Sequence, residues 1–320
     1  MGSEGLQVET VGCNFCESKE YTVHDALDGW TIVKCHQCGF FFTNPRPTAD
    51  GLLSFYSEEY YKDERHCEKF FNNEDGSIKI DELEYNVSII ESHFDNPGKL
   101  LEIGAATGGF LRFMKHRGWN VYGVEVSKYA VEIAKKFNRI EMFCGALENF
   151  RTDEKFDVIC MFQTLEHVPN PAYVIERSYQ LLKRNGIIVI QVPNLNGFDI
   201  KISKERKRLV YDLPRHLNHF VPDVLEKKLG STGFKVMDID LYYPSFVLHL
   251  AKLLNFLRGN NTKGSGSNNN NSTAKHEDQN TQQGNDYTQV RKKNKNWKVS
   301  LLNCISRVFP GWRFTIVARK

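Results

Sequence analysis

The sequence predicts an α/β protein with a small cysteine-rich module at its N-terminal end. Two observations lead to this fold class. Four cysteines stand in two Cys-x-x-Cys pairs, and a strand, a glycine-rich turn, a helix and a second strand follow one another from residue 98. Strand-like and helix-like runs continue to alternate after that unit, as in a sheet with helical crossovers. A chain of 320 residues is long enough for one large domain and a small one.

The composition narrows the classes of protein that fit. A net charge of +3 is too small to predict nucleic-acid binding by itself, and the hydrophobic share of 41% is ordinary for a globular protein. No apolar run after Met1 indicates a secretory signal, and no run approaches the roughly 18 residues of a membrane span. Eight cysteines in such a chain indicate thiols in a reducing compartment, so we expect a cytoplasmic protein.

The cysteine module has the spacing C-x2-C-x18-C-x2-C, formed by Cys13, Cys16, Cys35 and Cys38. Two residues between thiolates let both sulfurs of a pair reach one metal, and two pairs complete the tetrahedron of a zinc site. Strand-like runs at 21–23, 30–35 and 39–45 surround the pairs, which favours a zinc ribbon. Because four thiolates leave no open coordination position, this zinc is expected to be structural. Four unligated thiols are the alternative interpretation.

The glycine-rich unit points to a ligand that carries a ribose. The stretch GKLLEIGAATGGFLRFM, 98–114, reads as a strand, a tight turn and a helix, and GWNVYGVEVS, 118–127, adds a second strand. Such a turn brings a ligand against backbone N–H groups at the helix N-terminus. Glu125 lies about 20 residues beyond the turn, where an acidic side chain can accept hydrogen bonds from ribose hydroxyls. Glu102 precedes Gly104, and it suits a cationic amino acid group better than a pyrophosphate.

With these motifs in this order, the chain resembles the class I S-adenosylmethionine-dependent methyltransferases over nearly all of the sequence after residue 80. The first motif of that family matches LEIGAATGGF, 101–110, with Ala106 where glycine is commoner, and its ribose acid matches Glu125. Later strands of the family match 140–150, 156–168, 170–194, 233–243 and 313–320, the last two as an antiparallel pair at the sheet edge. The resemblance implies a Rossmann-like seven-stranded sheet with helices on both faces.

The resemblance also implies the cofactor and the residues that hold it. S-adenosylmethionine is the expected methyl donor, and Ala146 stands where the family often has an acidic contact to adenine. Adenine recognition is therefore expected from backbone groups or from Glu148. The residues expected to bind the cofactor are Glu102, Gly104, Ala105, Ala106, Thr107, Gly108, Glu125, Val126, Ala146, Leu147 and Gln163.

The N-terminal half extends the resemblance to methyltransferases found with sugar and polysaccharide genes. These carry a four-cysteine module followed by segments similar to CGFFFTNPRP, 38–47, and FYSEEYY, 55–61.

Residues 215–236 are similar to a histidine-containing segment of deoxysugar C-methyltransferases, in which His216 matches the histidine. Leu213 and Arg215 replace the tyrosine and glutamate of that segment, so a hydroxyl acceptor is as well supported as a carbon acceptor. The expected acceptor is a sugar-containing or other small biosynthetic molecule.

Histidines are the candidates for activating a hydroxyl acceptor. A hydroxyl is a poor nucleophile until its proton leaves, and histidine can take up a proton near neutral pH. His216 is the first candidate for this general base and His167, after the fourth strand, is the second, whereas His219 is expected to be structural. Three tyrosines are candidates for lining the acceptor pocket or for joining the ribbon to the main domain: Tyr56, Tyr60 and Tyr61.

Two other functions stay open from the sequence. The chain is similar to ribosomal RNA methyltransferases that carry a four-cysteine module, and basic runs at 201–208 and 291–298 could contact phosphates. A solvated face or a flexible tail is the plainer interpretation of these runs. A further observation opposes methylation of base amines: the stretch FQTLEH, 162–167, lacks the Asn/Asp-Pro-Pro-aromatic turn of the enzymes that do this. A catalytically inactive cofactor-binding protein is the other alternative, favoured by Ala106 and Ala146.

The expected domain organisation is a zinc ribbon at 1–47, a helical connector at 48–97 and the methyltransferase domain at 98–320. A polar segment at about 259–296 interrupts the main domain, and its composition predicts disorder. The flanking segments 243–259 and 297–312 have apolar residues at helical spacing. They are expected to form a helical hairpin on the sheet edge or a peripheral contact with the inner face of the membrane. The sequence does not predict the oligomeric state.

Overall fold

The computed structural model describes residues 6–56, 80–241 and 310–320. Several sequence expectations concern residues outside these ranges. They are the polar segment at 259–296, the amphipathic segment at 243–259, most of the one at 297–312, the basic run at 291–298, and Tyr60 and Tyr61. Within the ranges that are described, no helix combines the length and the apolar composition needed to cross a membrane.

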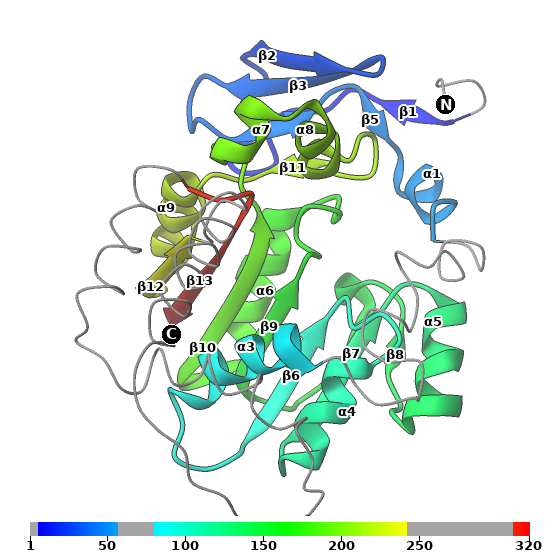
Figure 1. Ribbon diagram of the computed structural model, residues 1–320, viewed down its shortest axis with the longest axis vertical. Coiled ribbons are helices and arrows are strands. Elements are labelled where there is room, and N and C mark those ends of the chain that lie inside the picture. Colours follow the sequence, from blue (N-terminus) through cyan, green and yellow to red (C-terminus); the bar gives the residue numbers. More distant parts are fainter. Residues whose placement is uncertain (1–5, 57–79, 242–309) are drawn as a thin grey trace, which may run out of the picture.

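The main sheet has seven strands in the order β12-β13-β10-β9-β6-β7-β8 (Figure 1). The strands from β10 to β8 run parallel to one another, whereas β13 is antiparallel to both β10 and β12. The expected antiparallel pair therefore ends the sheet, with β12 as its outer strand. The strands are β6 (Lys99–Ile103), β7 (Asn120–Glu125), β8 (Phe143–Cys144), β9 (Phe156–Phe162), β10 (Leu182–Pro193), β12 (Lys235–Leu241) and β13 (Arg313–Arg319).

Helices cover both faces of this sheet, as the sequence predicts. Strand β9 and the part of β10 from Ile187 onward are mostly apolar, because side chains on both faces of a central parallel strand are buried. One face packs in a core with α6 (Pro171–Leu181) and α9 (Pro222–Thr232), and the other packs with α3 (Ile80–Glu91) and α4 (Gly109–His116). Alternation along one strand is clear in β9, where Ile159 and Met161 face the first core and Val158 and Cys160 face the second.

Helix starts follow ordinary capping chemistry. Ser127 accepts a hydrogen bond from the backbone N–H of Ala130 at the start of α5 (Lys128–Ile133), which continues as the π-helical turn η2 (Ala134–Asn138). Asn170 caps α6 in the same way, and Pro171 occupies the first turn, where a missing N–H costs nothing. These caps fix where the chain turns back after β7 and after β9. Both turns lie at the carboxyl ends of parallel strands.

The N-terminal module is a small sheet of four strands in the order β11-β4-β3-β2, with a separate pair formed by β1 (Val8–Glu9) and β5 (Arg46–Pro47). Three strands come from the expected ribbon: β2 (Tyr21–Leu27), β3 (Trp30–Cys35) and β4 (Phe41–Thr43). The fourth, β11 (Asn218–His219), comes from the main domain and pairs with β4. Side chains of the ribbon and of the main domain also share one apolar core, in which the ring centroids of Phe40 and Phe220 lie 5.6 Å apart.

The ribbon lies beyond the carboxyl end of β10, beside the helices α7 (Phe198–Ile202) and α8 (Lys204–Tyr211) (Figure 1). The short helix α1 (Ala49–Leu53) follows the ribbon and leads toward the same end of the sheet. Side chains on α8 hold the ribbon strand β2 and the turn after it. The Tyr211 hydroxyl donates to Asp25 at 2.6 Å, and Arg208 pairs with Asp28 at 3.0 Å. The ribbon is thereby attached close to the end of the sheet where ligands bind in this class of fold.

Candidate active site

A cavity of about 710 Å³ opens at the carboxyl ends of β6, β7 and β9. Its wall comes from the turn after β6, the end of β7, residues 145–149 after β8, residues 162–169 after β9, helix α1 and the segment 212–216. Parallel α/β sheets bind their ligands in this position, and the volume suits a small organic ligand. The cavity is therefore the candidate active site.

The glycine-rich turn has a backbone that only some residues tolerate. Gly104 has φ +74°, and a Cβ at that position would lie 2.4 Å from the side chain of Thr164, so glycine is required there. Gly108, with φ +75°, precedes α4 in the same left-handed region. Ala106 also has a positive φ, +46°, although it is not glycine. Its backbone N–H donates to Oε2 of Glu125 at 2.9 Å, which stabilises this conformation.

Glu125 lies at the end of β7, on the cavity wall, with a relative exposure of 6%. One of its oxygens accepts from the N–H of Ala106 and the other accepts from the N–H of Ser127, both at 2.9 Å. These bonds hold the carboxylate in one orientation at the cavity. A carboxylate accepts hydrogen bonds from hydroxyl groups as well as from backbone N–H groups. This geometry fits the predicted role toward a ribose.

Glu102 is a buried carboxyl group directly before the turn, with 5% relative exposure. Its Oε2 has no hydrogen-bond partner among the residues that the structure describes. Burial, together with the nearby charge of Glu125, raises the pKa of Glu102 to about 8. An unpaired buried carboxyl group is costly, and a cationic ligand group would relieve that cost. The residue is thus suited to the ammonium group of an amino acid portion.

The structure brings most of the predicted cofactor residues into one cavity. Those that line it are Gly104, Ala106, Glu125, Val126, Ala146, Leu147 and Gln163, and Glu148 lies beside them. Four of the predicted residues are not among those that line it: Glu102, Ala105, Thr107 and Gly108. Gln163 has a positive φ of +51°, and its buried Nε2 has no partner within the described part of the chain. The polar groups at the cavity are buried carboxylates, the backbone of the glycine-rich turn and the side-chain amide of Gln163. Together they fit a ligand with hydroxyl and ammonium groups.

His167 and His216, the two predicted general bases, lie side by side in the cavity wall with ring centroids 4.7 Å apart. Nδ1 of His167 lies 3.1 Å from the carbonyl oxygen of Arg215, and Nδ1 of His216 lies 2.8 Å from that of Val210. Because a carbonyl oxygen only accepts, each Nδ1 carries a proton. Burial lowers the pKa of both rings, that of His167 to about 3, so both are neutral with a lone pair on Nε2.

His219 lies in β11 with 4% relative exposure and is not among the residues that line the cavity. Its Nε2 is 3.0 Å from the hydroxyl of Thr43, and that hydroxyl donates to the carbonyl oxygen of His216 at 2.7 Å. His219 therefore supports the backbone of His216 from the ribbon side. This placement agrees with the structural role expected for it.

Two acidic residues that the sequence did not single out also line the cavity. Glu166 has 1% relative exposure, and neither of its carboxylate oxygens has a hydrogen-bond partner among the described residues. Burial raises the pKa of Glu166 to about 8. Asp212 pairs with Arg215 at 2.7 Å and lies 3.6 Å from Nε2 of His216. In the sequence, Glu166 could have been found from its position next to His167 in the stretch LEH. No sequence feature indicates Asp212, whose position beside the cavity is known only from the structure.

The four predicted zinc ligands come together in the ribbon. Their sulfur atoms all lie within 4.8 Å of one another, with Cys13 and Cys38 at 3.4 Å and Cys16 and Cys35 at 3.5 Å. Zinc–thiolate bonds of about 2.3 Å place tetrahedral sulfurs roughly 3.8 Å apart, so the cluster fits a zinc ion. The ribbon also reaches the cavity. The side chains of Asn14 and Arg46 donate to the carbonyl oxygen of Pro169 in its wall.

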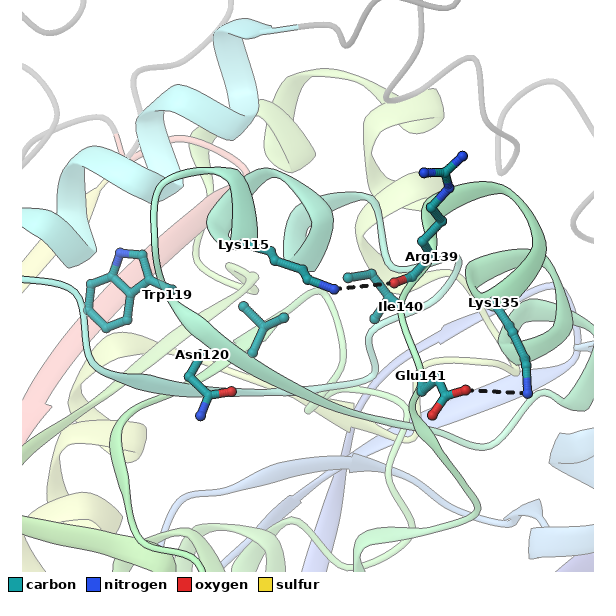
Figure 2. Close-up of a pocket in the computed structure, with 8 residues that line it drawn as sticks. Lys115, Trp119, Asn120, Lys135, Arg139, Ile140 and Glu141 are labelled. Carbon is teal, nitrogen blue, oxygen red and sulfur yellow. Dashed lines mark hydrogen bonds and ion pairs between the residues drawn. The ribbon is translucent and has the colours of Figure 1, made fainter.

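A second cavity, of about 580 Å³, lies at the opposite end of β7, between α4 and the residues after η2. Figure 2 shows the side chain of Lys115 directed at the main-chain carbonyl of Arg139, 3.5 Å away. Lys135 pairs with Glu141 at 3.4 Å across the same region. The charged groups of Lys115 and Lys135 are therefore already bonded to other residues of the protein. The predicted cofactor and histidine residues lie in the other cavity.

Comparison with known proteins decides the family. A family model described as a methyltransferase domain matches residues 80–239, which is 160 of the 320 residues. The chain belongs to the methyltransferase family. The matched range includes the glycine-rich turn, Glu125, Glu166 and both histidines of the cavity. The ribbon lies outside it.

Curated relatives match part of this range. The chain is 37% identical over 101 residues to a ubiquinone biosynthesis O-methyltransferase of Pelagibacter ubique, covering 30% of this chain and 42% of the relative. It is 30% identical over 154 residues to an uncharacterized protein of Methanocaldococcus jannaschii, covering 48% of this chain and 66% of that protein. The chain thus spans about half the length of the curated relatives it matches.

Solved structures show the same fold. A SAM-dependent methyltransferase from Archaeoglobus fulgidus superposes with a TM-score of 0.50 at 17% sequence identity. The superposition covers 82% of this chain and 100% of the other. Phosphoethanolamine N-methyltransferase 2 of Haemonchus contortus, in complex with S-adenosyl-L-methionine, gives 0.50 at 16% identity, over 87% of this chain and 62% of that one. The expected Rossmann-like methyltransferase fold is confirmed.

Proposed function

We propose that this methyltransferase takes its methyl group from S-adenosylmethionine and transfers it to a hydroxyl oxygen of a small biosynthetic acceptor. The observation that supports this most is that one cavity contains both the Glu125 end, suited to a ribose, and the histidine pair. A donor and an acceptor that share this space would lie next to each other. Several relatives are named O-methyltransferases, which favours oxygen over carbon as the acceptor atom.

Cofactor binding is assigned to the turn and the two carboxyl groups at its base. Glu125 would accept hydrogen bonds from the ribose hydroxyls, and Glu102 would balance the ammonium charge from behind the turn. Ala146 and Leu147 would flank the adenine, with Glu148 at hand as an acceptor for its amino group. Bound S-adenosylmethionine supplies a sulfonium methyl group that is already activated for transfer. The protein's own contribution is then orientation, exclusion of water and activation of the acceptor.

Acceptor activation is assigned to His167 and His216. Both side chains line the cavity, and in both rings the nitrogen with a lone pair is Nε2. The acceptor hydroxyl must lose its proton as its oxygen forms the new bond to carbon, and these nitrogens are placed to assist. Leu52, Leu53 and Tyr56 close the cavity from the α1 side, which limits water near the reacting oxygen. A sugar-containing acceptor remains the preferred class within this proposal.

The alternative of an RNA substrate has less support from the geometry. The basic run at 201–208 lies on α7 and α8, and two of its cations pair with carboxylates of the ribbon: Lys207 with Asp25 at 2.7 Å and Arg208 with Asp28 at 3.0 Å. Cations used for internal ion pairs contribute less to a phosphate-binding surface. We also propose that the four cysteines hold a structural zinc ion in the ribbon.

The test of cofactor binding is calorimetric titration of the full-length protein with S-adenosylmethionine. The variant Glu125→Ala should bind at least about tenfold more weakly, because charge-assisted hydrogen bonds are each worth about 1.5–3 kcal/mol. The matched control is Glu132→Gln, an exposed glutamate on α5, which should bind like the wild type. Unchanged affinity in Glu125→Ala, or no binding by the wild type, would reject this assignment.

A further inference from the structure

Glu166 is not explained by methyl transfer through histidines alone. A histidine that takes up a proton needs an acceptor hydroxyl nearby, but it does not need a buried carboxylate. Glu166 nevertheless lines the cavity with 1% relative exposure, and both of its oxygens lack a partner in the described ranges. Burying a carboxyl group without hydrogen bonds is energetically unfavourable. Such a group is expected where a positively charged ligand arrives.

The two neighbouring histidines are held as metal-binding histidines usually are. In each ring, Nδ1–H donates to a backbone carbonyl oxygen, from Arg215 in one case and from Val210 in the other. This outer hydrogen bond fixes the ring and its tautomer, and it leaves the Nε2 lone pair to bind a cation. The arrangement is present although neither residue takes part in regular secondary structure.

The distances also suit a single cation. Glu166, His167 and His216 each offer one ligand atom, and all three atoms lie within 4.8 Å of one another. A cation about 2.1 Å from each ligand atom keeps any two of them at most about 4.2 Å apart. The separations therefore need to close by less than about 1 Å on binding.

We propose that Glu166, His167 and His216 bind one divalent cation on the wall of the active-site cavity. Two imidazoles and one carboxylate are a ligand set for Zn²⁺, Mn²⁺ or Fe²⁺, and three protein ligands leave coordination positions open toward the cavity. Asp212 lies 3.6 Å from His216 Nε2 and pairs with Arg215, so it offsets the positive charge of Arg215 beside the cation.

This inference rests on the proposed function and specifies how the acceptor is activated. The cation binds the acceptor hydroxyl oxygen in an open position and lowers its pKa, so that the proton leaves to water. The oxygen lone pair then forms the new bond to the methyl carbon while the carbon–sulfur bond breaks and its electron pair stays on sulfur. The histidines assist the loss of the proton in this step through the cation that they bind.

Mn²⁺ is the probe that separates this site from the ribbon, because soft thiolates disfavour Mn²⁺ whereas carboxylate and imidazole accept it. Full-length protein with its ribbon metal retained is titrated with Mn²⁺, and the signal of unbound Mn²⁺ is followed by electron paramagnetic resonance. The wild type should bind about one Mn²⁺ per chain. Glu166→Gln and His216→Gln, which keep similar side-chain volumes, should each weaken binding by at least about tenfold. The control is His24→Gln, on the exposed face of β2.

Affinity for S-adenosylmethionine is measured on the same samples. Retained affinity shows that each variant is folded, and His216→Gln serves as the test if Glu166→Gln does not fold. A wild type that binds S-adenosylmethionine but no Mn²⁺ would overturn the cation site and leave the proposed function in place. Equal Mn²⁺ binding by the wild type and both variants would overturn it as well. Absence of S-adenosylmethionine binding would instead reject the proposed function.

Discussion

Two groups of side chains in the described part of the chain can hold a metal ion, and they differ in chemistry and in surroundings. The ribbon cluster has four thiols, and their sulfur atoms all lie within 4.8 Å of one another. The cavity cluster, Glu166 with His167 and His216, has one oxygen and two nitrogen ligands and borders a cavity of about 710 Å³. A closed set of four thiolates can only support the fold, whereas three ligands beside open space can bind a reactant. The same property, clustering of ligand atoms, thus indicates structure in one place and chemistry in the other.

Removal of a ribbon ligand should give the largest effect. Cys35→Ser is expected to lose the zinc and to destabilise the fold by several kcal/mol, since structural zinc contributes about 10–16 kcal/mol in small zinc peptides. The loss should extend into the main domain, because the cysteines and Phe40 belong to the same core as Phe220. Elemental analysis and thermal unfolding measure both effects, with the exposed Cys144→Ser as control. A normal metal content and unfolding temperature in Cys35→Ser would contradict a structural zinc.

Loss of a cavity histidine should affect turnover and leave the fold in place. His216→Ala or His167→Ala is expected to lower the rate by about 10²–10⁴, the usual range for loss of a group that assists proton removal. Affinity for S-adenosylmethionine should stay close to that of the wild type. The rate is measured as release of the demethylated cofactor with a panel of hydroxyl acceptors. If His216→Ala turned over at the wild-type rate, the histidine pair would have no part in acceptor activation.

Cofactor affinity should depend on pH through Glu102. Its pKa is raised to about 8 in the ligand-free protein, by burial and by Glu125. A cationic ligand favours the ionised carboxylate, so binding below pH 8 releases a proton and the affinity rises as the pH rises toward 8. The change is at most about tenfold per pH unit. Calorimetry between pH 6 and 8 measures it, and Glu102→Gln should remove most of the slope. An equal slope in Glu102→Gln would assign the pH dependence to another group.

The same residue predicts the pH dependence of stability. Because the folded-state pKa of Glu102 is above its ordinary value of 4.5, its contribution is fully present below about pH 4.5 and is lost as the pH rises through about 8. Thermal unfolding of the ligand-free protein should therefore show a decrease over this range. Glu102→Gln should show a smaller decrease, and an undiminished one would contradict the assignment.

The contact between the ribbon and the cavity should give the smallest effect. Asn14 donates a hydrogen bond of 3.0 Å to the carbonyl oxygen of Pro169. Asn14→Ala should cost about 1 kcal/mol of stability, the typical value of one such bond. The control Asn120→Ala, at an exposed position, should change stability by less than about 0.5 kcal/mol. Denaturant unfolding measures both, and equal values for the two variants would show that this contact does not stabilise the protein.

The features that follow from local spacing could be predicted from the sequence. Two residues between the cysteines of each pair predict that the four sulfurs come together, and about 20 residues between the turn and Glu125 predict that this acid lies beside the turn. The turn also shows why Ala106 is tolerated: the Glu125 carboxylate accepts its N–H. A substitution that weakened the motif in the sequence is thus compensated by a neighbour in space.

The acceptor side of the cavity could not be predicted in the same way, because its parts come from distant segments. His167 and His216 are 49 positions apart in the sequence, yet their rings are 4.7 Å apart. The importance of Glu166 depends on its burial without a partner, which no sequence pattern records. Nor does the sequence show that Asn218 and His219 complete the ribbon sheet, since a two-residue strand has no periodicity to detect.

The strand β11 has a consequence for engineering this protein. It pairs with β4 of the ribbon and begins two residues after His216, whose carbonyl oxygen accepts a hydrogen bond from the hydroxyl of Thr43 in that same β4. The ribbon is therefore not a unit that can be exchanged alone between family members. A chimera that replaces the ribbon without residues 210–220 would pair a foreign strand with β11 and shift the histidine in the cavity. Exchanging both segments together would transfer the acceptor side of the cavity as one piece.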